Sequence, residues 1–108
     1  MPTSPNAVVA LCTCPPSVAE SLARSLVDRR AAACVNILPA VQSIYRWKDQ
    51  VESEQEALLI IKSTRDRWTL LTELVQQNHP YEVPELIRLP VDAGLDPYLD
   101  WISQATEV

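Results

Sequence analysis

The sequence AACVNILPAVQSIYRWKDQVESEQEALLIIKS, residues 32–63, decides the fold because it is strand-like on both sides of one polar reversal. The part before the reversal KDQ, residues 48–50, is rich in β-branched and aromatic side chains. In the part after it, two sets of residues alternate between the faces of a strand, which are Glu54, Glu56, Leu58 and Ile60 on one side and Gln55, Ala57, Leu59 and Ile61 on the other. Pro39 cannot donate a ladder hydrogen bond, so it marks a bulge or an edge position in one long, bent strand over about 33–47. The segment therefore predicts a long β-hairpin.

Two further strands and two helices are predicted around this hairpin. The stretch AVVALCTC is small, apolar and β-branched and stops at a pair of prolines, which is typical of a strand buried on both faces. Elsewhere apolar residues recur at three- and four-residue spacing, as on the buried face of a helix. The predicted elements are a strand at 7–14, a helix at about 18–30, a second helix that ends at Asn78 and Pro80, and a strand at 83–91.

A candidate N-terminal cap precedes each predicted helix, because Ser, Thr and Asp side chains accept hydrogen bonds from the free amides of a first turn. The order is then βαββαβ with a C-terminal helix, which is the α+β ferredoxin-like arrangement with an antiparallel sheet. We expect a single domain over residues 1–108. The candidate caps are Ser17 with Glu20 three residues later, Ser63 or Thr64, and Asp96 followed by Pro97, which opens the C-terminal helix.

The predicted hairpin is longer than the helices beside it. A strand over 33–47 extends roughly 50 Å at about 3.3 Å per residue, whereas a helix over 18–30 covers only about 20 Å. The outer hairpin nevertheless carries apolar side chains that a lone subunit could not bury, so we expect another copy of the chain to cover them. These side chains are Ile44, Tyr45, Trp47 and Val51.

Composition and charge exclude several classes of function. Hydrophobic residues make up 47% and charged residues 21% of the 108, which is typical of a globular domain. The formal net charge is -5 and the basic residues are scattered, so no nucleic-acid partner is expected. The longest apolar run, 57–61, is too short to span a bilayer, so no membrane partner is expected. Gly94 is the only glycine, which excludes the usual glycine-rich nucleotide loops.

The cysteines and the chain start predict a cytoplasmic location. Cys12, Cys14 and Cys34 cannot all pair within one chain, and each lies in an apolar setting typical of a reduced, buried thiol. The start MPTSPN is polar and lacks the basic and apolar parts of a signal peptide.

The stretch HPYEVPE, residues 79–85, holds the only histidine of the chain together with two prolines, two carboxylates and a tyrosine. Pro80 and Pro84 push His79 and Val83 toward extended backbone, so the stretch predicts a stiff corner between a helix and a strand. Such a corner can also hold polar groups in place for binding.

Motifs along nearly the whole chain resemble one known family. ACVNILP, SIYRW, ALLIIKS, HPYEVPE, the strand end LP and the tail DPYLDWI are similar, in order and spacing, to the CutA family of divalent-cation tolerance proteins. The resemblance implies a small cytoplasmic protein that responds to metal ions and forms a homotrimer, with long hairpins reaching neighbouring subunits. Copper binding is attributed to some members, and animal members are linked to anchoring of acetylcholinesterase. The resemblance implies no enzyme activity and no required cofactor.

The resemblance also implies metal ligands. The ligands discussed for metal-binding members correspond here to Cys12, His79 and Glu85, a mixed set that suits Cu(II) or another divalent metal. Asn78 stands where some members have a second histidine, so we expect weak binding, and Ala40 stands where glycine is common.

The residues themselves leave other roles open. Cys12 and Cys14 share one face of a strand, where they either pack in the core or present two thiolates to a soft metal. His79 either binds a ligand or caps the preceding helix as an imidazolium. The acidic residues of the hairpin are expected to be solvated. They are Glu52, Glu54 and Glu56.

Three classes of function follow. The first is a metal-binding or metal-responsive trimer. The second is a signalling module of the PII type that binds a small molecule or a protein, by analogy of fold and trimer alone. The third is an acylphosphatase-like hydrolase, which is disfavoured because the chain lacks a glycine-rich anion loop and an obvious oxyanion site.

Overall fold

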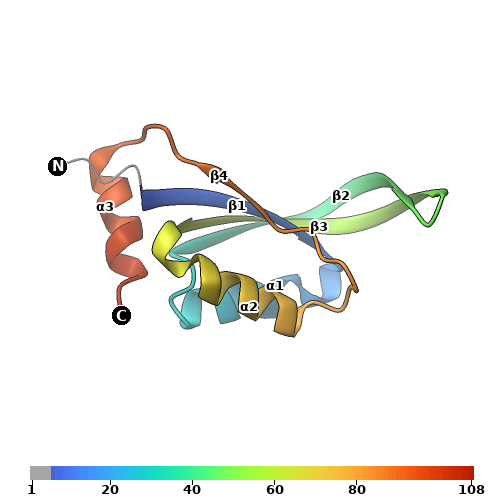
Figure 1. Ribbon diagram of the computed structural model, residues 1–108, viewed down its shortest axis with the longest axis horizontal. Coiled ribbons are helices and arrows are strands. Elements are labelled where there is room, and N and C mark those ends of the chain that lie inside the picture. Colours follow the sequence, from blue (N-terminus) through green and yellow to red (C-terminus); the bar gives the residue numbers. More distant parts are fainter. Residues whose placement is uncertain (1–5) are drawn as a thin grey trace.

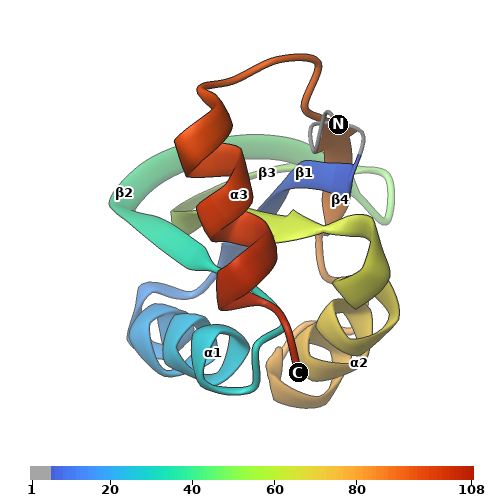
Figure 2. The same cartoon turned by 90° about the vertical axis from the view of Figure 1, so that its left-hand side faces the viewer.

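The computed structural model describes residues 6–108, and the polar residues 1–5 lie outside this range. Four strands form one antiparallel sheet in the order β2-β3-β1-β4, with two helices on one face and a third across one end (Figures 1 and 2). This is the predicted ferredoxin-like arrangement with a C-terminal helix. The elements are β1 (Ala7–Cys14), α1 (Pro16–Asp28), β2 (Cys34–Trp47), β3 (Gln50–Thr64), a 3-10 turn (Arg65–Arg67), α2 (Trp68–Asn78), β4 (Ile87–Pro90) and α3 (Asp96–Ala105).

The long hairpin is confirmed as one continuous ladder between β2 and β3. The register shifts between Leu38 and Val41, so the extra residue lies around Pro39, on a strand that is also a sheet edge. The turn places Lys48 at φ 51° and Asp49 at φ 65°, the left-handed backbone that a two-residue hairpin turn requires. Beyond the bulge the hairpin extends past both helices as an arm, residues 41–56 (Figure 1).

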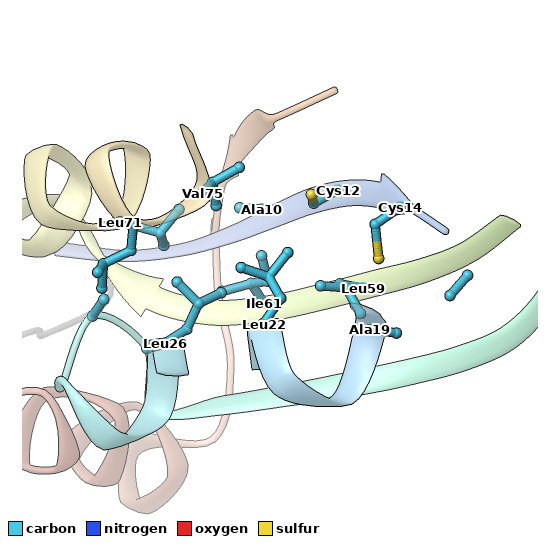
Figure 3. Close-up of a cluster of buried hydrophobic side chains, with 14 residues drawn as sticks. Ala10, Cys12, Cys14, Ala19, Leu22, Leu26, Leu59, Ile61, Leu71 and Val75 are labelled. Carbon is cyan, nitrogen blue, oxygen red and sulfur yellow. The ribbon is translucent and has the colours of Figure 1, made fainter. Parts of the chain in front are cut away.

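The main core lies between the sheet and the helices α1 and α2. Cys12 and Cys14 project from β1 toward these helices and are fully buried, which confirms that they share a face (Figure 3). Cys34 is only half-buried, so the expectation of a buried thiol is wrong at that position. The buried side chains of this cluster include Ala10, Leu22, Leu26, Leu59, Ile61, Leu71 and Val75.

The opposite face of the sheet is apolar and has no helix over it in the described chain (Figure 2). Leu11 pairs with Ile60 on one side and with Ile87 on the other, so all three project away from the helices that cover the adjacent residue Cys12. By the same alternation the open face, as we call it, carries the polar residues Thr13, Asn36 and Lys62 and a set of apolar residues, which are Val9, Leu11, Leu38, Leu58, Ile60, Ile87 and Leu89. Ile87 and Leu89 are 53% and 49% exposed.

Helix α3 closes the end of the sheet farthest from the arm. Its Leu99 and Ile102 pack on Ala7 and Ala33 in a small second cluster. No helix within residues 6–108 combines the length and the apolar composition needed to cross a bilayer.

The predicted caps are wrong for all three helices. Helix α1 begins at Pro16 with no side-chain cap, because proline presets the first-turn backbone and needs no amide partner. Glu20 instead pairs with Arg24 at 2.9 Å. The Ser63 hydroxyl donates to the Ala31 carbonyl at 2.6 Å, since β3 continues through this position. Asp96 lies in the first turn of α3, after the N-cap Leu95.

The fourth strand is shorter than predicted. It pairs with β1 only from Ile87 to Pro90, whereas a strand was expected over 83–91. Pro84 has no amide to donate to a strand ladder. Before it, Tyr81 is bound to His79 and Glu56 and not to β1.

Candidate functional site

The predicted corner is confirmed between α2 and β4. Residues 79–86 form no helix or strand, and His79 leaves the helix in extended backbone at φ -96° and ψ 133°. This is the backbone that the following Pro80 requires. The corner, as we call residues 79–86, runs beside the end of β1, where the predicted site residues lie.

His79 is only 8% exposed, and both of its ring nitrogens make hydrogen bonds within the protein. Its Nδ1 accepts a hydrogen bond from the Tyr81 amide at 3.2 Å. As an acceptor at Nδ1, the ring carries its proton on Nε2, which lies 2.7 Å from the Thr13 carbonyl oxygen and donates to it. The imidazolium cap is therefore wrong, and the Asn78 side chain instead donates to the Leu74 carbonyl at 2.8 Å.

Tyr81 ties the corner to the base of the arm. Its hydroxyl donates to the Glu56 carboxylate at 2.9 Å, and Glu56 is only 5% exposed. Burial and the hydrogen bond to Glu56 raise the pKa of Tyr81. The expectation that Glu56 is solvated is therefore wrong. Its position next to the apolar run 57–61 was the one sequence signal of this buried carboxylate.

A second phenol–carboxylate pair lies farther out on the arm. The Tyr45 hydroxyl donates to the Glu54 carboxylate, and this bond, with lesser contributions from burial and nearby carboxylates, raises the pKa of Tyr45 to about 12. Glu54 and Glu56 are two residues apart on β3, so the two pairs lie on the same face of the arm.

Thr13 contacts all three predicted metal ligands, although its side chain projects to the open face of the sheet and the Cys12 side chain projects to the core. Its carbonyl receives His79 Nε2 and lies 3.7 Å from the Cys12 sulfur. Its hydroxyl donates to the Glu85 carboxylate at 3.3 Å. Nothing in the sequence pattern pointed to Thr13, because its role comes from a backbone carbonyl and from contacts distant in the chain.

In this conformation the donor set does not fit a metal ion. Within residues 6–108, no three His, Cys, Asp or Glu side chains stand together in a group that could hold one. Burial first, and then the nearby Cys14, Glu85 and Glu56, raise the pKa of Cys12 to about 12, so its thiol keeps its proton. His79 has no free nitrogen. The assignment of Cys12, His79 and Glu85 as ligands remains a prediction.

The hydrogen bonds of His79 also argue against nucleophilic catalysis by a cysteine. A Cys–His pair needs an imidazole that accepts the thiol proton, but His79 gives Nε2 to a carbonyl and Nδ1 to an amide. What the arrangement does is hold the corner, β1 and the arm base in one hydrogen-bonded unit.

Replacing Tyr81 with Phe should lower the free energy of unfolding by about 1–3 kcal/mol, because it leaves the buried Glu56 carboxylate without its donor. Tyr45→Phe is the matched control, since Glu54 is exposed to water and loses less. Urea unfolding of both variants measures the difference. Equal losses would show that the Tyr81–Glu56 bond is not a buried contact.

Stability should fall at alkaline pH. Burial raises the pKa of Cys12 from its ordinary value of 9.0 to about 12 in the folded chain, so the stability that its protonated thiol contributes is complete below pH 9 and is lost as pH rises toward 12. Unfolding free energy measured across this window should decline, and Cys12→Ala should reduce the slope. An unaltered slope in Cys12→Ala would contradict the burial of its thiol.

Comparison with known proteins places these features in one family. Residues 8–105 match the family described as CutA1 divalent ion tolerance protein. "Protein CutA" of Mus musculus is 48% identical over 99 residues, covering 91% of this chain and 56% of the mouse protein. The chain thus spans little more than half the length of that relative. "Divalent-cation tolerance protein CutA" of Thermus thermophilus is 47% identical, covering 82% of this chain and 86% of that protein.

Solved structures agree with the sequence relatives. The divalent cation tolerance protein Cut A1 of Thermus thermophilus matches with a TM-score of 0.91 at 45% identity, covering 94% of this chain and 99% of the other. The structure named "PII-like protein CutA" from Nostoc matches with a TM-score of 0.88 at 38% identity, covering 93% of this chain and 97% of the other. These relatives are named for cation tolerance or for likeness to PII and not for a reaction. The chain belongs to the CutA1 divalent ion tolerance family.

Proposed function

We propose that the protein is a homotrimeric binding module of the PII-like kind, which takes part in the response to divalent cations in the cytoplasm and does not catalyse a reaction. The single observation that carries the proposal is the open face of the sheet. Its apolar residues belong to all four strands, and the helices α1 and α2 cover only the other side (Figure 2). An exposed, largely apolar face that extends over several strands marks an association surface.

The edges of the sheet support the same proposal. Both β2 and β4 are edge strands whose outer backbone groups are unpaired within the described chain. The outer part of β2 also belongs to the arm, which extends beyond the helices. Edge strands with apolar side chains pair readily with other chains, and a closed ring of copies would cover them without exposing a new edge.

The role as a binding module rests on the polar contacts of the corner. They hold the side chains in fixed positions without presenting a nucleophile and base pair. Three free cysteines, two of them fully buried, suit the reducing cytoplasm.

Ile60→Glu should convert the trimer into a monomer, because it places a carboxylate in the middle of the open face. Light scattering at low micromolar concentration should give three chain masses for wild type and one for the variant. Val27→Glu is the control, since Val27 is 42% exposed on α1 at the other side of the sheet. A monomeric wild type would defeat the proposal, and circular dichroism would separate a folded monomer from an unfolded chain.

Direct binding of Cu(II) or another divalent metal is the second candidate. It is favoured by the contact that each of Cys12, His79 and Glu85 makes with Thr13. Binding through His79 would require the ring to release the Thr13 carbonyl or the Tyr81 amide, and Cys12 to lose its proton. Both requirements lower the affinity, so we expect weak binding that weakens further as pH falls.

Calorimetric titration of Cu(II) and of Zn(II) tests this second candidate. His79→Ala and Cys12→Ser should each abolish the heat of binding that wild type shows, and the affinity of wild type should drop between pH 7.5 and pH 5.5, through about the range in which histidine titrates. Cys34→Ser is the control thiol. Equal binding by all four proteins would remove Cys12 and His79 from the ligand set.

A further inference from the structure

A cavity of about 310 Å³ lies at the end of the sheet that α3 closes. It is formed where the 3-10 turn before α2 comes near the last turn of α3, at the opposite end of the molecule from the arm (Figures 1 and 2). Small-molecule sites have volumes of about 300–1,000 Å³, so this cavity is at the lower end of that range and suits a ligand of few atoms.

Thr64, the last residue of β3, lines this cavity with a hydroxyl that lacks a partner. Its side chain is only 3% exposed. Within residues 6–108 the hydroxyl makes no hydrogen bond, and no fully enclosed polar side-chain atom of that range lacks one, so the hydroxyl opens to the cavity. A nearly buried polar group is normally paired. Thr64 therefore marks the cavity as a place for a polar ligand.

Arg67 supplies a cation to the same cavity. Its side chain is half-buried, and the ion pair within residues 6–108 is Glu20–Arg24, so the Arg67 guanidinium has no carboxylate of that range at ion-pair distance. A guanidinium binds a carboxylate through two parallel hydrogen bonds. The cavity can therefore receive the carboxylate of a small molecule.

Two acidic side chains, Asp66 and Glu107, also line the cavity. The Asn6 side-chain amide donates to the Asp66 carboxylate at 3.1 Å, which fixes the position of that group. Together with Arg67 they give the described lining one positive and two negative charges, a formal charge of -1. This lining repels a simple anion, whereas a ligand with both an ammonium and a carboxylate meets a partner for each.

The end of α3 adds hydroxyls that are held in place. Thr106 is only 3% exposed, and its hydroxyl donates to the Ile102 carbonyl at 2.9 Å, so its oxygen still offers lone pairs as acceptors. Ser103 lines the cavity one turn earlier. The Arg30 guanidinium donates to the Ala105 carbonyl at 3.2 Å and tethers this last turn to the end of α1. Groups that are already fixed lower the cost of binding.

We propose that this cavity binds a free α-amino acid with a small polar side chain. The carboxylate of the ligand lies on Arg67, and its ammonium lies between Asp66 and Glu107. The ligand side chain meets the hydroxyls of Thr64 and Ser103. All these residues belong to one chain, so the site requires neither the trimer nor the predicted metal ligands of the corner.

Titration of L-serine into the ¹⁵N-labelled protein at pH 7, followed by amide NMR, tests the proposal. Saturable shifts should appear at residues 64–67 and 103–107. Ethanolamine lacks the carboxylate of serine and 3-hydroxypropanoate lacks its ammonium, so each should bind about tenfold more weakly or worse, because each loses a charged hydrogen-bonded contact. Absence of shifts with L-serine, shifts at the corner instead, or equal binding by either analogue would overturn the proposal.

Two variants locate the ligand. Arg67→Gln should weaken L-serine binding about tenfold or more and leave ethanolamine binding unchanged, because ethanolamine has no carboxylate to lose a partner. Arg65→Gln is the matched control, since Arg65 is exposed on the same 3-10 turn and does not line the cavity. Thr64→Val keeps the shape of the side chain and should also weaken L-serine.

Unchanged L-serine affinity in Arg67→Gln or in Thr64→Val, or an equal loss in Arg65→Gln, would contradict the site. The amide spectrum of each variant shows whether it is folded. Light scattering separates this proposal from the trimer, because a monomeric wild type that binds L-serine would end the trimer proposal and leave the amino-acid site standing.

Discussion

The β2–β3 ladder is longer than the helix layer that covers the sheet, and the rest of the structure depends on this mismatch. Strand β3 has 15 residues and pairs with β1 only from Ala57 to Thr64, so its first half has β2 as its sole neighbour in the described chain. Helix α1 has 13 residues and extends only about 20 Å. The radius of gyration is 14.5 Å, compared with about 13 Å for a compact chain of this size. In the trimer proposed above, a neighbouring copy would hold the part of the hairpin that extends beyond its own subunit.

The sequence predicted those features that follow from periodicity over many residues. The hairpin, the shared face of Cys12 and Cys14 and the break at Pro39 depend on alternation and on the missing proline amide, which are local and strong signals. The helix caps depended on only one or two residues each and were wrong. In α1 a proline already starts the helix, and before α2 the strand pairing of Thr64 with Ala7 outweighs a side-chain cap.

At the candidate site, too, the sequence predicted local features and missed contacts between distant residues. The corner could be predicted, because prolines restrict the backbone wherever they occur. The engagement of both His79 nitrogens could not, since one partner is the carbonyl of Thr13, 66 positions away in the chain. Glu56 was misassigned because alternation places it on the outer side of a strand, and only the fold brings the Tyr81 hydroxyl to it. Contacts between distant backbone and side-chain atoms leave no periodic trace in a sequence.

Hydrogen bonds join the corner to β1 and to the base of the arm, so metal binding at the corner and association of copies through the arm would affect each other. Tyr81 binds Glu56 at the arm base, and His79 binds Thr13 at the end of β1, so a ligand that displaced the His79 ring would also disturb the strand beside the arm. If neighbouring copies hold the arms, displacement costs more in the assembled protein than in a single chain, because the arm is then fixed at both ends. Ligand binding at the corner and association of the copies would in that case oppose each other through the same two hydrogen bonds, and by linkage each must weaken the other to the same degree.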